Sequence, residues 1–330
     1  MLQASAPTDA VAPVSPTGLR LVPSRCPVCL MDEPEPVAVG EDFIHRVTND
    51  SVLAVECPGC GLVYLSPQPA TEERVRVYPP SYFTPSPGGR SDGRAARRAR
   101  AAARRAVRAC GQMPPDARVL EVAYGPRLHL GELRGSSPRT WILEVVTPHE
   151  ALGGSARGAG RAVRQGYPHE MEDRIAAYDA VLLLHSLEHC PSPVDELRSI
   201  YRLLRPGGML VILTENADSM VSRVFRGRHW AGYDFPRHPS LFGPRPLRRL
   251  AGLTGFEVRR IRTFGGPEVW LRSTALLLKD WASLSRLTSI VSLGAPFLGG
   301  FAWLVEAVCS GRGKGARLEA VLRKPGTSPP

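Results

Sequence analysis

The segment Ala117–Leu133, ARVLEVAYGPRLHLGEL, decides the fold of this 330-residue chain. Its first part, Arg118–Val122, is a short apolar run that predicts a buried strand and contains the acidic residue Glu121. At Gly125 the chain can turn sharply and its backbone can approach a ligand. Leucines at helical spacing follow this glycine. The segment therefore predicts a strand, a tight turn and a helix. This is either an ordinary structural unit or the first unit of a nucleotide-binding fold.

Downstream of this segment, the chain alternates strand and helix patterns, which predicts a doubly wound, mostly parallel α/β sheet. Asp179–Leu184 is a continuous apolar run, as expected for a strand that is buried on both faces. Helices are predicted near Pro148, over Pro193–Leu204 and over Leu247–Ala251. The seven predicted strands are Arg118–Val122, Thr140–Val145, Arg161–Arg164, Asp179–Leu184, Met209–Thr214, Phe256–Thr263 and Leu318–Arg323.

Four cysteines near the start of the chain form two C-x-x-C pairs. They are Cys26, Cys29, Cys57 and Cys60. Each pair can occupy a tight turn with both sulfurs directed at one metal ion, and four thiolates suit tetrahedral zinc. Because four protein ligands leave no open position, we expect a structural rather than a catalytic zinc ion. Between the pairs, Phe43–Val47 and Ser51–Val55 are predicted as short strands joined at Asn49-Asp50.

The composition pattern predicts several units along the chain. We expect a disordered lead-in over 1–22, a zinc-knuckle unit over 23–84, a linker and Arg-rich helix over 85–110, the core over 111–264, a helical apolar insertion over 265–316, and the last strand and tail over 317–330. The start of the chain has neither a basic region nor the apolar core of a signal peptide, and its seven cysteines are an odd number. We therefore expect reduced thiols and a cytoplasmic protein.

The net charge of +11 is concentrated in two stretches. Arg90–Arg108 holds eight arginines against one aspartate, and Arg245–Arg262 holds six against one glutamate. Such stretches are either solvated faces or sites that attract anions, namely a phosphorylated substrate, nucleic acid or acidic lipid. The first stretch has no interleaved aromatic residues, so it is poorly suited to stacking single-stranded nucleic acid.

A run of 19 uncharged residues, Leu287–Val305, lies near the end of the chain. A membrane-spanning helix needs about 20 mostly apolar residues. The run contains a proline and three glycines, and it lies between two predicted strands of one sheet. We interpret it as a helical insertion that packs over the active-site side or contacts a membrane surface.

Residues Tyr178–Leu213, YDAVLLLHSLEHCPSPVDELRSIYRLLRPGGMLVIL, resemble the second half of class I S-adenosylmethionine-dependent methyltransferases. The elements Leu187-Glu188-His189 and Leu204-Arg205-Pro206-Gly207-Gly208 carry this resemblance in combination. Together with the cysteine pairs, the chain resembles the zinc-knuckle branch of that family, which includes sugar C-methyltransferases and polysaccharide-pathway methyltransferases. The segment His229–Phe256 is also similar to the region after strand five of these proteins. The resemblance implies a Rossmann-like methyltransferase core and S-adenosylmethionine as the cofactor.

The resemblance also implies a cofactor site at the strand ends. Glu121, Ala123 and Gly125 would hold the amino-acid part, Glu144 the ribose hydroxyls, and Gln165 and Tyr167 the adenine, while His185 would lie near the sulfonium. In the family the glycine turn has the pattern E-x-G-x-G-x-G. In this chain Ala123 and Arg127 replace the first and third glycines, and Gly125 is retained. Arg127 can swing outward, pair with the cofactor carboxylate or block the site.

Methyl transfer needs positioning, and it needs a base when the nucleophile carries a proton. Histidine suits that role near neutral pH. The catalytic candidates are His185, His238, His229 and Tyr233, and Glu188 and His189 are assigned to closing the turn after the strand. The substrate candidates are Trp230, Asp234 and Arg237, and a phosphate or diphosphate could be held by Arg237 and the Arg245–Arg249 cluster.

We therefore expect a methyltransferase that acts on a small molecule, most plausibly a sugar or glycoconjugate precursor, by C- or O-methylation. The acceptor could be phosphorylated or a nucleotide sugar. One alternative is a methyltransferase fold that has lost catalysis and serves as a binding or scaffold protein. Another is a nucleic-acid methyltransferase, which the zinc unit and the Arg90–Arg108 stretch suggest. The sequence has no Asn-Pro-Pro-Tyr-type motif for base amino groups, which speaks against this alternative.

Overall fold

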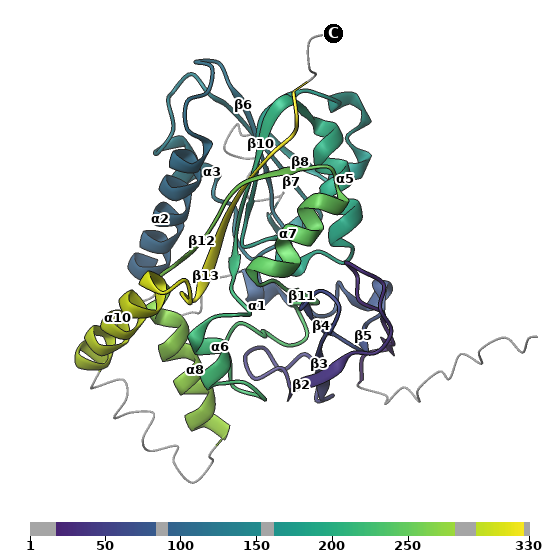
Figure 1. Cartoon of the computed structure of the whole chain (residues 1–330), viewed down its shortest axis with the longest axis vertical. Helices are drawn as coiled ribbons and strands as arrows, with labels where there is room; N and C mark the ends of the chain where they lie inside the picture. Colours follow the sequence, from purple (N-terminus) through teal and green to yellow (C-terminus); the bar gives the residue numbers. More distant parts are fainter. Residues whose placement is uncertain (1–17, 84–91, 153–161, 281–294, 327–330) are drawn as a thin grey trace, which may run out of the picture.

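The computed structural model describes residues 18–83, 92–152, 162–280 and 295–326 (Figure 1). A seven-stranded sheet forms its centre, with the strand order β12-β13-β10-β9-β6-β7-β8. Strand β13 is antiparallel to both of its neighbours, and the other pairings are parallel. The prediction of a doubly wound, mostly parallel, seven-stranded sheet is confirmed. The strands are β6 Arg118–Val122, β7 Ile142–Thr147, β8 Ala162–Gln165, β9 Tyr178–Leu184, β10 Leu204–Glu215, β12 Glu257–Phe264 and β13 Arg317–Arg323.

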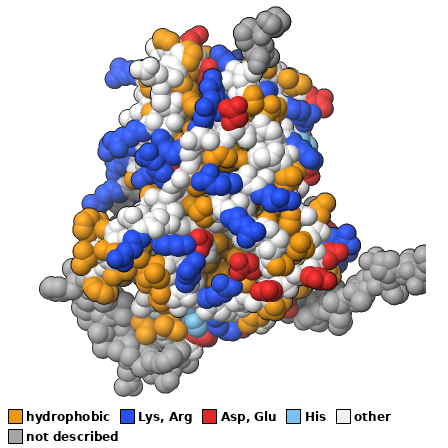
Figure 2. Space-filling model, viewed as in Figure 1, with side chains coloured by type: hydrophobic (Ala, Val, Ile, Leu, Met, Phe, Trp, Pro, Cys, Tyr) orange, Lys and Arg blue, Asp and Glu red, His pale blue; other side chains and the backbone are white. Residues whose placement is uncertain are grey.

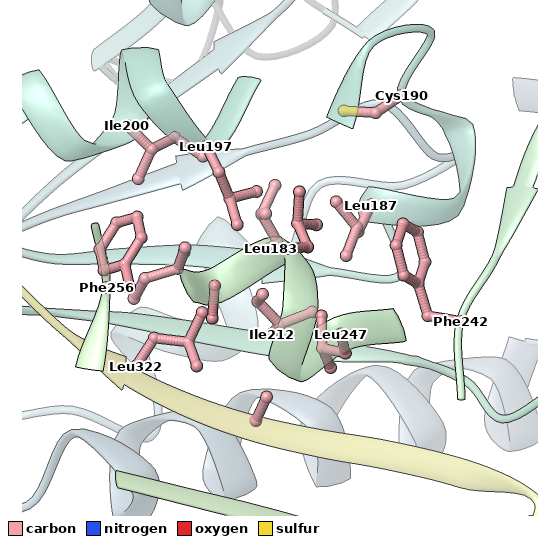
Figure 3. Close-up of a cluster of buried hydrophobic side chains, with 14 of the residues drawn as sticks. Leu183, Leu187, Cys190, Leu197, Ile200, Ile212, Phe242, Leu247, Phe256 and Leu322 are labelled. Carbon is pink, nitrogen blue, oxygen red and sulfur yellow. The ribbon is translucent and has the colours of Figure 1, made fainter. Parts of the chain in front are cut away.

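Helices cover both faces of this sheet (Figure 1). On one face, α2 (Asp92–Cys110) and α3 (Leu130–Arg134) bury small and aliphatic side chains against the strands. On the other face, α5 (Pro193–Leu203) and α7 (Pro244–Leu253) do the same. Figure 3 shows this second layer, where Leu197, Ile200 and Leu247 meet Leu183 and Ile212 of the central strands. Because both faces are covered, the central strands are apolar along their length.

A second sheet carries the cysteines. Its strand order is β11-β4-β3-β2, from β2 (Glu35–Gly40), β3 (Val52–Glu56), β4 (Val63–Leu65) and β11 (Ser240–Leu241). Strand β11 begins 200 residues after the end of β2, so a segment of the core completes the sheet of the zinc unit. The cysteines also belong to the same buried cluster as α5 and α7. The two units therefore share one hydrophobic core.

The predicted strand Phe43–Val47 is wrong, because this segment forms a turn and β2 pairs with β3 instead. Asp42 explains the difference. Its buried carboxylate accepts hydrogen bonds from the backbone N–H groups of His45 and Val47, at 2.9 and 3.1 Å. A side chain that satisfies these donors locally replaces the ladder partner that a strand would need.

The expected disordered lead-in is also wrong over its last residues. Leu21–Val22 form β1, which pairs with β5 (Gln68–Pro69), and Leu19 is buried. Residues 1–17 lie outside the described residues. The short helix α1 (Pro80–Phe83) precedes the predicted linker, much of which also lies outside them.

After β12 the chain forms α8 (Pro267–Asp280) and, beyond residues that the structure does not describe, α10 (Ala295–Gly311). These two helices contact each other. The predicted apolar run begins outside the described residues and ends within α10. In the part of the chain that the structure describes, no helix is long and apolar enough to cross a bilayer.

Candidate methyltransferase site and metal centre

The four thiols of the C-x-x-C pairs converge on one point. All four sulfurs lie within 4.8 Å of one another. The sulfurs of Cys26 and Cys60 are 3.5 Å apart, and those of Cys29 and Cys57 are 3.3 Å apart. Sulfurs around tetrahedral zinc lie about 3.8 Å apart, given Zn–S bonds of about 2.3 Å. Gly61, with a φ of 76°, supplies the left-handed conformation that follows the second pair. The donor set and its spacing fit a structural zinc ion.

A cavity of about 680 Å³ opens where the carboxyl ends of β9 and β10 meet α2, α8 and the segment 231–238. We call it the central cavity. Ligands of open α/β sheets bind outside these strand ends. The zinc unit also contributes to its lining through His45 and Tyr82. The central cavity holds three predicted site residues with ionisable side chains: His185, Asp234 and His238.

His185 directly follows β9 and has a φ of 52°, so its backbone leaves the strand in a left-handed turn. Its Nδ1 lies 3.4 Å from a carboxylate oxygen of Glu188 and 3.8 Å from one of Glu215. Burial pushes the pKa of Glu188 upward, but the hydrogen bond from His185 and the charge of that ring lower it to about 2. Glu188 also accepts a hydrogen bond from the hydroxyl of Thr214, at 2.7 Å. Glu188 is therefore an ionised carboxylate that orients His185.

His238 is buried and lines the same cavity. Its Nδ1 lies 2.7 Å from the carbonyl oxygen of Gly232, which can only accept a hydrogen bond. Nδ1 therefore carries a proton, and in the neutral ring Nε2 holds the free lone pair. An oxygen of Asp234 lies 3.9 Å from Nε2. Burial raises the pKa of Asp234, but the charges of Arg237 and His238 outweigh this effect and hold the pKa well below its usual range. His238 thus has the geometry of a base with an anionic neighbour.

His189 separates the central cavity from a second cavity. Its ring nitrogens lie 3.2 and 3.4 Å from the hydroxyls of Tyr78 and Tyr82, and Nδ1 is 3.2 Å from the carbonyl of Arg237. Burial, together with the charge of His238, lowers the pKa of His189 to about 3. The ring is therefore neutral at physiological pH and holds the two tyrosines in place.

The second cavity, which we call the aromatic cavity, has a volume of about 840 Å³. Its lining includes Tyr78, Phe83 and His149, whose rings contact one another, and the predicted adenine-site residues Gln165 and Tyr167. It lies at the carboxyl ends of β7 and β8. His189 lines both cavities. The predicted cofactor residues are thus divided, with Gly125 and His185 on one side and Gln165 and Tyr167 on the other.

Gly125 has a clear physical reason to lack a side chain. A Cβ atom at this position would lie 2.8 Å from the carbonyl oxygen of His185, inside any normal contact. The turn after β6 and the end of β9 therefore meet at van der Waals distance, and the backbone of Gly125 lines the central cavity. Ala123 is buried, and its N–H donates to the carbonyl of Val146 at 3.0 Å. A side chain of one carbon fits at Ala123.

The two predicted acidic cofactor ligands are engaged within the protein. Glu121 is buried, and its carboxylate accepts hydrogen bonds from the backbone and ring nitrogens of His129, all within 3.0 Å. Glu144 lies within β7 rather than at its end, and it binds Arg118 at 2.6 Å and Tyr178 at 2.7 Å. The expectation that Glu144 stands at the strand end is wrong, since the strand continues to Thr147.

Three candidates from the segment 229–238 do not reach the central cavity. Tyr233 and Trp230 are buried against each other, with ring centroids 5.0 Å apart, inside the core of the zinc unit. Burial raises the pKa of Tyr233 to about 12. The Nε2 atom of His229 lies 2.9 Å from the carboxylate of Asp280 on α8. The aromatic and polar residues of this segment are typical of a binding loop, but Trp230 and Tyr233 pack into the core.

Arg237 is likewise not available to a substrate. Its guanidinium is fully buried and makes two hydrogen bonds to Asp42, at 2.7 and 2.9 Å. The remaining N–H groups contact Asp234 and the backbone carbonyls of Val77 and Phe235. The Arg245–Arg249 cluster lies on α7, on the opposite face of the sheet from α2. The prediction that Arg237 holds a phosphate is therefore wrong, and the Arg245–Arg249 cluster is not part of the described lining of the central cavity.

Sequence reasoning named Arg127 but missed Arg272, and both line the central cavity. Arg127 and Arg272 are both exposed at its edge and have no hydrogen bond or ion pair among the described residues. Arg272 lies on α8, which the sequence pattern had marked only as apolar insertion. Arg127 is exposed and lines the edge of the cavity, so its side chain does not fill the cavity. His45 and Tyr82 were also missed, because only the fold brings the zinc unit to the ends of β9 and β10.

The comparisons with known proteins agree with this geometry. Residues 94–261 match the family described as a methyltransferase domain. The chain therefore belongs to the class I S-adenosylmethionine-dependent methyltransferase family, and its seven-stranded, mostly parallel sheet is the Rossmann-like sheet of that class.

Among curated proteins, a ubiquinone biosynthesis O-methyltransferase of Aeromonas salmonicida is 32% identical over 94 residues, which are 25% of this chain and 37% of that protein. The chain thus matches little more than a third of that relative's length. Among solved structures, a Burkholderia thailandensis 1,6-didemethyltoxoflavin-N1-methyltransferase is similar with a TM-score of 0.48 and 18% identity, covering 88% of this chain and 99% of that one. A Streptomyces coelicolor geranyl diphosphate C-methyltransferase has a TM-score of 0.46 and 14% identity, covering 74% and 89%.

Proposed function

We propose that this protein transfers a methyl group from S-adenosylmethionine to a small acceptor with an anionic group, in particular a sugar phosphate or nucleotide sugar on the way to a glycoconjugate. The observation that carries the proposal is His238. Its Nδ1–H is fixed by the Gly232 carbonyl, so the lone pair on Nε2 is available in the central cavity, which His185 at the end of β9 also lines. A zinc ion on the four cysteines is part of the same proposal and has a structural role.

S-adenosylmethionine, when bound, supplies an electrophilic methyl group. Gly125 and His185 would hold its amino-acid side, and Gln165 and Tyr167 would hold its base. The aromatic cavity offers rings for stacking, and the absence of a Cβ atom at Gly125 leaves backbone for close approach. The central cavity would then receive the acceptor.

The residues of the central cavity supply acid–base chemistry and anion binding. His238 accepts a proton from the acceptor at Nε2, whether that proton is on carbon or oxygen, and Asp234 stabilises the resulting imidazolium. Arg127 and Arg272 provide guanidinium groups for a phosphate. The anionic acceptor follows from these two arginines, and the sugar follows from the resemblance of the chain to sugar methyltransferases.

The test is a methylation assay with zinc-loaded protein, S-adenosylmethionine and a panel of sugar phosphates and nucleotide sugars, read by mass spectrometry. We expect one panel member to gain a methyl group. The His238→Gln variant should bind S-adenosylmethionine with unchanged affinity and lose about 10²–10⁴-fold in kcat. His229→Gln is the matched control, because His229 lies outside the cavity. Equal losses in both variants would contradict the role of His238.

A second candidate function is a binding protein without catalysis. It is favoured by the engagement of Glu121 and Glu144 within the protein and by Arg127 in place of a glycine. Absence of S-adenosylmethionine binding by the folded protein would support this candidate. Methylation of a short RNA rather than any sugar would instead support a nucleic-acid methyltransferase.

A further inference from the structure

Helix α10 exposes its apolar face and buries its charge. Phe301, Trp303 and Leu304 are 68%, 63% and 57% exposed, and Val308 is 48% exposed. Glu306 is buried on the opposite face. This arrangement is the inverse of a surface helix in water, which directs its charged residues outward.

The inward position of Glu306 is fixed by three partners. It accepts hydrogen bonds from the indole N–H of Trp270 at 2.8 Å, the backbone N–H of Ala316 at 2.7 Å and the hydroxyl of Ser310 at 3.2 Å. These contacts hold α10 in one rotation about its axis. The packing of Glu306 therefore fixes the orientation of α10 in which its apolar side chains face outward.

A groove of about 810 Å³ lies beside α2 and β12 and is lined almost entirely by arginines. We call it the arginine groove. Among the described residues that line it, Glu319 is the only acidic one, and Arg105 and Arg260 already neutralise it at 3.0 and 2.9 Å. The other cations of the groove are Arg97, Arg100, Arg104, Arg108 and Arg262, all of them exposed. None of these described lining residues is aromatic.

The arginine groove and α10 are joined through the end of β12. The guanidinium of Arg105 lies 3.9 Å above the ring of Phe264. At the next residue, Gly265, a Cβ atom would meet the side chain of Glu306 at 3.5 Å. Figure 2 shows Lys and Arg side chains gathered over α2, with the hydrophobic side chains of α10 next to them on the same face.

We propose that this combined surface docks on a membrane of anionic lipids, with α10 lying in the plane of the interface and the arginine groove against lipid phosphates. Insertion of an exposed apolar helix face beside cations is the property of interfacial helices. Trp303 suits the boundary between headgroups and acyl chains. A nucleic acid would satisfy the arginines but leave the apolar face in water, and the groove offers no ring for base stacking.

The experiment is vesicle cosedimentation with zinc-loaded, full-length protein. Vesicles of phosphatidylcholine alone are compared with vesicles that contain phosphatidylglycerol, at low and high salt. We expect at least tenfold tighter binding to the anionic vesicles, weakened by salt, with a blue shift of tryptophan emission that the Trp303→Ala variant loses. Each of two double variants, Phe301→Ser/Leu304→Ser and Arg100→Gln/Arg104→Gln, should weaken binding at least tenfold.

Matched controls make the result decisive. Arg248→Gln/Arg249→Gln removes the same charge from α7 on the other face of the sheet, and Val75→Ser removes an 82% exposed apolar side chain from the zinc unit. Both controls should bind anionic vesicles like the wild type. Equal weakening by the two arginine pairs, or no effect of the α10 variant, would overturn the proposal. Tight binding of a short RNA that the α10 variant leaves unchanged would also overturn it. Circular dichroism of each variant confirms that it is folded.

Discussion

A single buried arginine joins the zinc unit to the methyltransferase core. Arg237 bridges Asp42 of the zinc unit and Asp234 at the central cavity, and all three side chains are almost entirely buried. Burial works against the charge on Asp42, but Arg237 outweighs it and lowers the pKa of this carboxyl. The arginine thereby holds the segment that carries His238 against the cysteine-bearing sheet.

We predict that Arg237→Met lowers the free energy of unfolding by about 3–5 kcal/mol, because it leaves two buried carboxylates without a cation. Denaturant unfolding measures this change. Arg198→Met is the control, since Arg198 pairs with Asp195 on the surface and such pairs contribute about 0–1 kcal/mol. A similar small change in both variants would contradict the bridging role.

His189 should make the protein sensitive to acid. Its pKa in the folded protein is about 3, against an ordinary value of 6.5, so the unfolded chain takes up a proton first as pH falls. Between these values the stability should fall with pH, at up to about 1.4 kcal/mol per pH unit. Above pH 6.5 this contribution is constant.

The comparison of wild type with His189→Gln isolates this effect. Unfolding free energies are measured at intervals from pH 7.5 to about 4.5, above the range in which buried carboxylates also titrate. The wild type should lose more stability than the variant over this range. Parallel pH profiles would show that folding does not lower the pKa of His189.

At this scale the sequence predicted some site residues and missed others for a physical reason. Of the catalytic and substrate candidates, His185, Asp234 and His238 line the central cavity, whereas Tyr233 and His229 are not among its described lining residues. His185 follows a strand, and the other four residues lie in one Pro-containing segment, so the local sequence does not distinguish them. Which of them faces the cavity is set by contacts with the zinc unit and with Asp280, which local sequence does not reveal.

At the scale of elements, the sheet of the zinc unit depends on a strand from the core. β11 pairs with β4 through Ser240 and Leu241, and the cysteines belong to the cluster that includes Phe242 and Leu247. Loss of the metal should therefore destabilise the shared core as well as the two turns that carry the cysteines.

We predict that the purified protein contains one zinc ion per chain and that a chelator lowers its melting temperature in a single transition. Metal analysis and calorimetry measure these two quantities. Cys29→Ser should reproduce the effect of the chelator, and Cys309→Ser, a cysteine outside the cluster, should leave zinc content unchanged. A separate early transition of the zinc unit would contradict the shared core.

The central elements could be predicted because their signals are local. Continuous apolar runs predicted β6, β9 and β10, and helical spacing predicted α5. The zinc unit was harder. Phe43–Val47 alternates like a strand, but Asp42 satisfies its backbone donors, and Asp42 is fixed by an arginine 195 residues away. The partner β11 is only two residues long and is too short for any periodic signal.

At the scale of the whole molecule, two cavities meet at His189, one at the ends of β7 and β8 and one at the ends of β9 and β10. The zinc unit closes both from one side, since Tyr78 and Tyr82 contact His189. We propose that the cofactor extends past the neutral His189 from the aromatic cavity to Gly125 and His185, and that the central cavity also receives the acceptor. The proposed function requires the cofactor to bind at the strand ends around Gly125.

The most direct test is a calorimetric titration of the zinc-loaded protein with S-adenosylmethionine and its demethylated product. We predict saturable binding of both compounds. We also predict loss of binding in the Gly125→Val variant, because the valine side chain would collide with the carbonyl of His185. Arg127→Gly should bind at least as tightly as the wild type, because the Arg127 side chain is exposed at the edge of the central cavity and makes no hydrogen bond or ion pair among the described residues. No heat from the folded wild type with either compound would contradict the methyltransferase function, and binding restored only by Arg127→Gly would identify a fold retained without its activity.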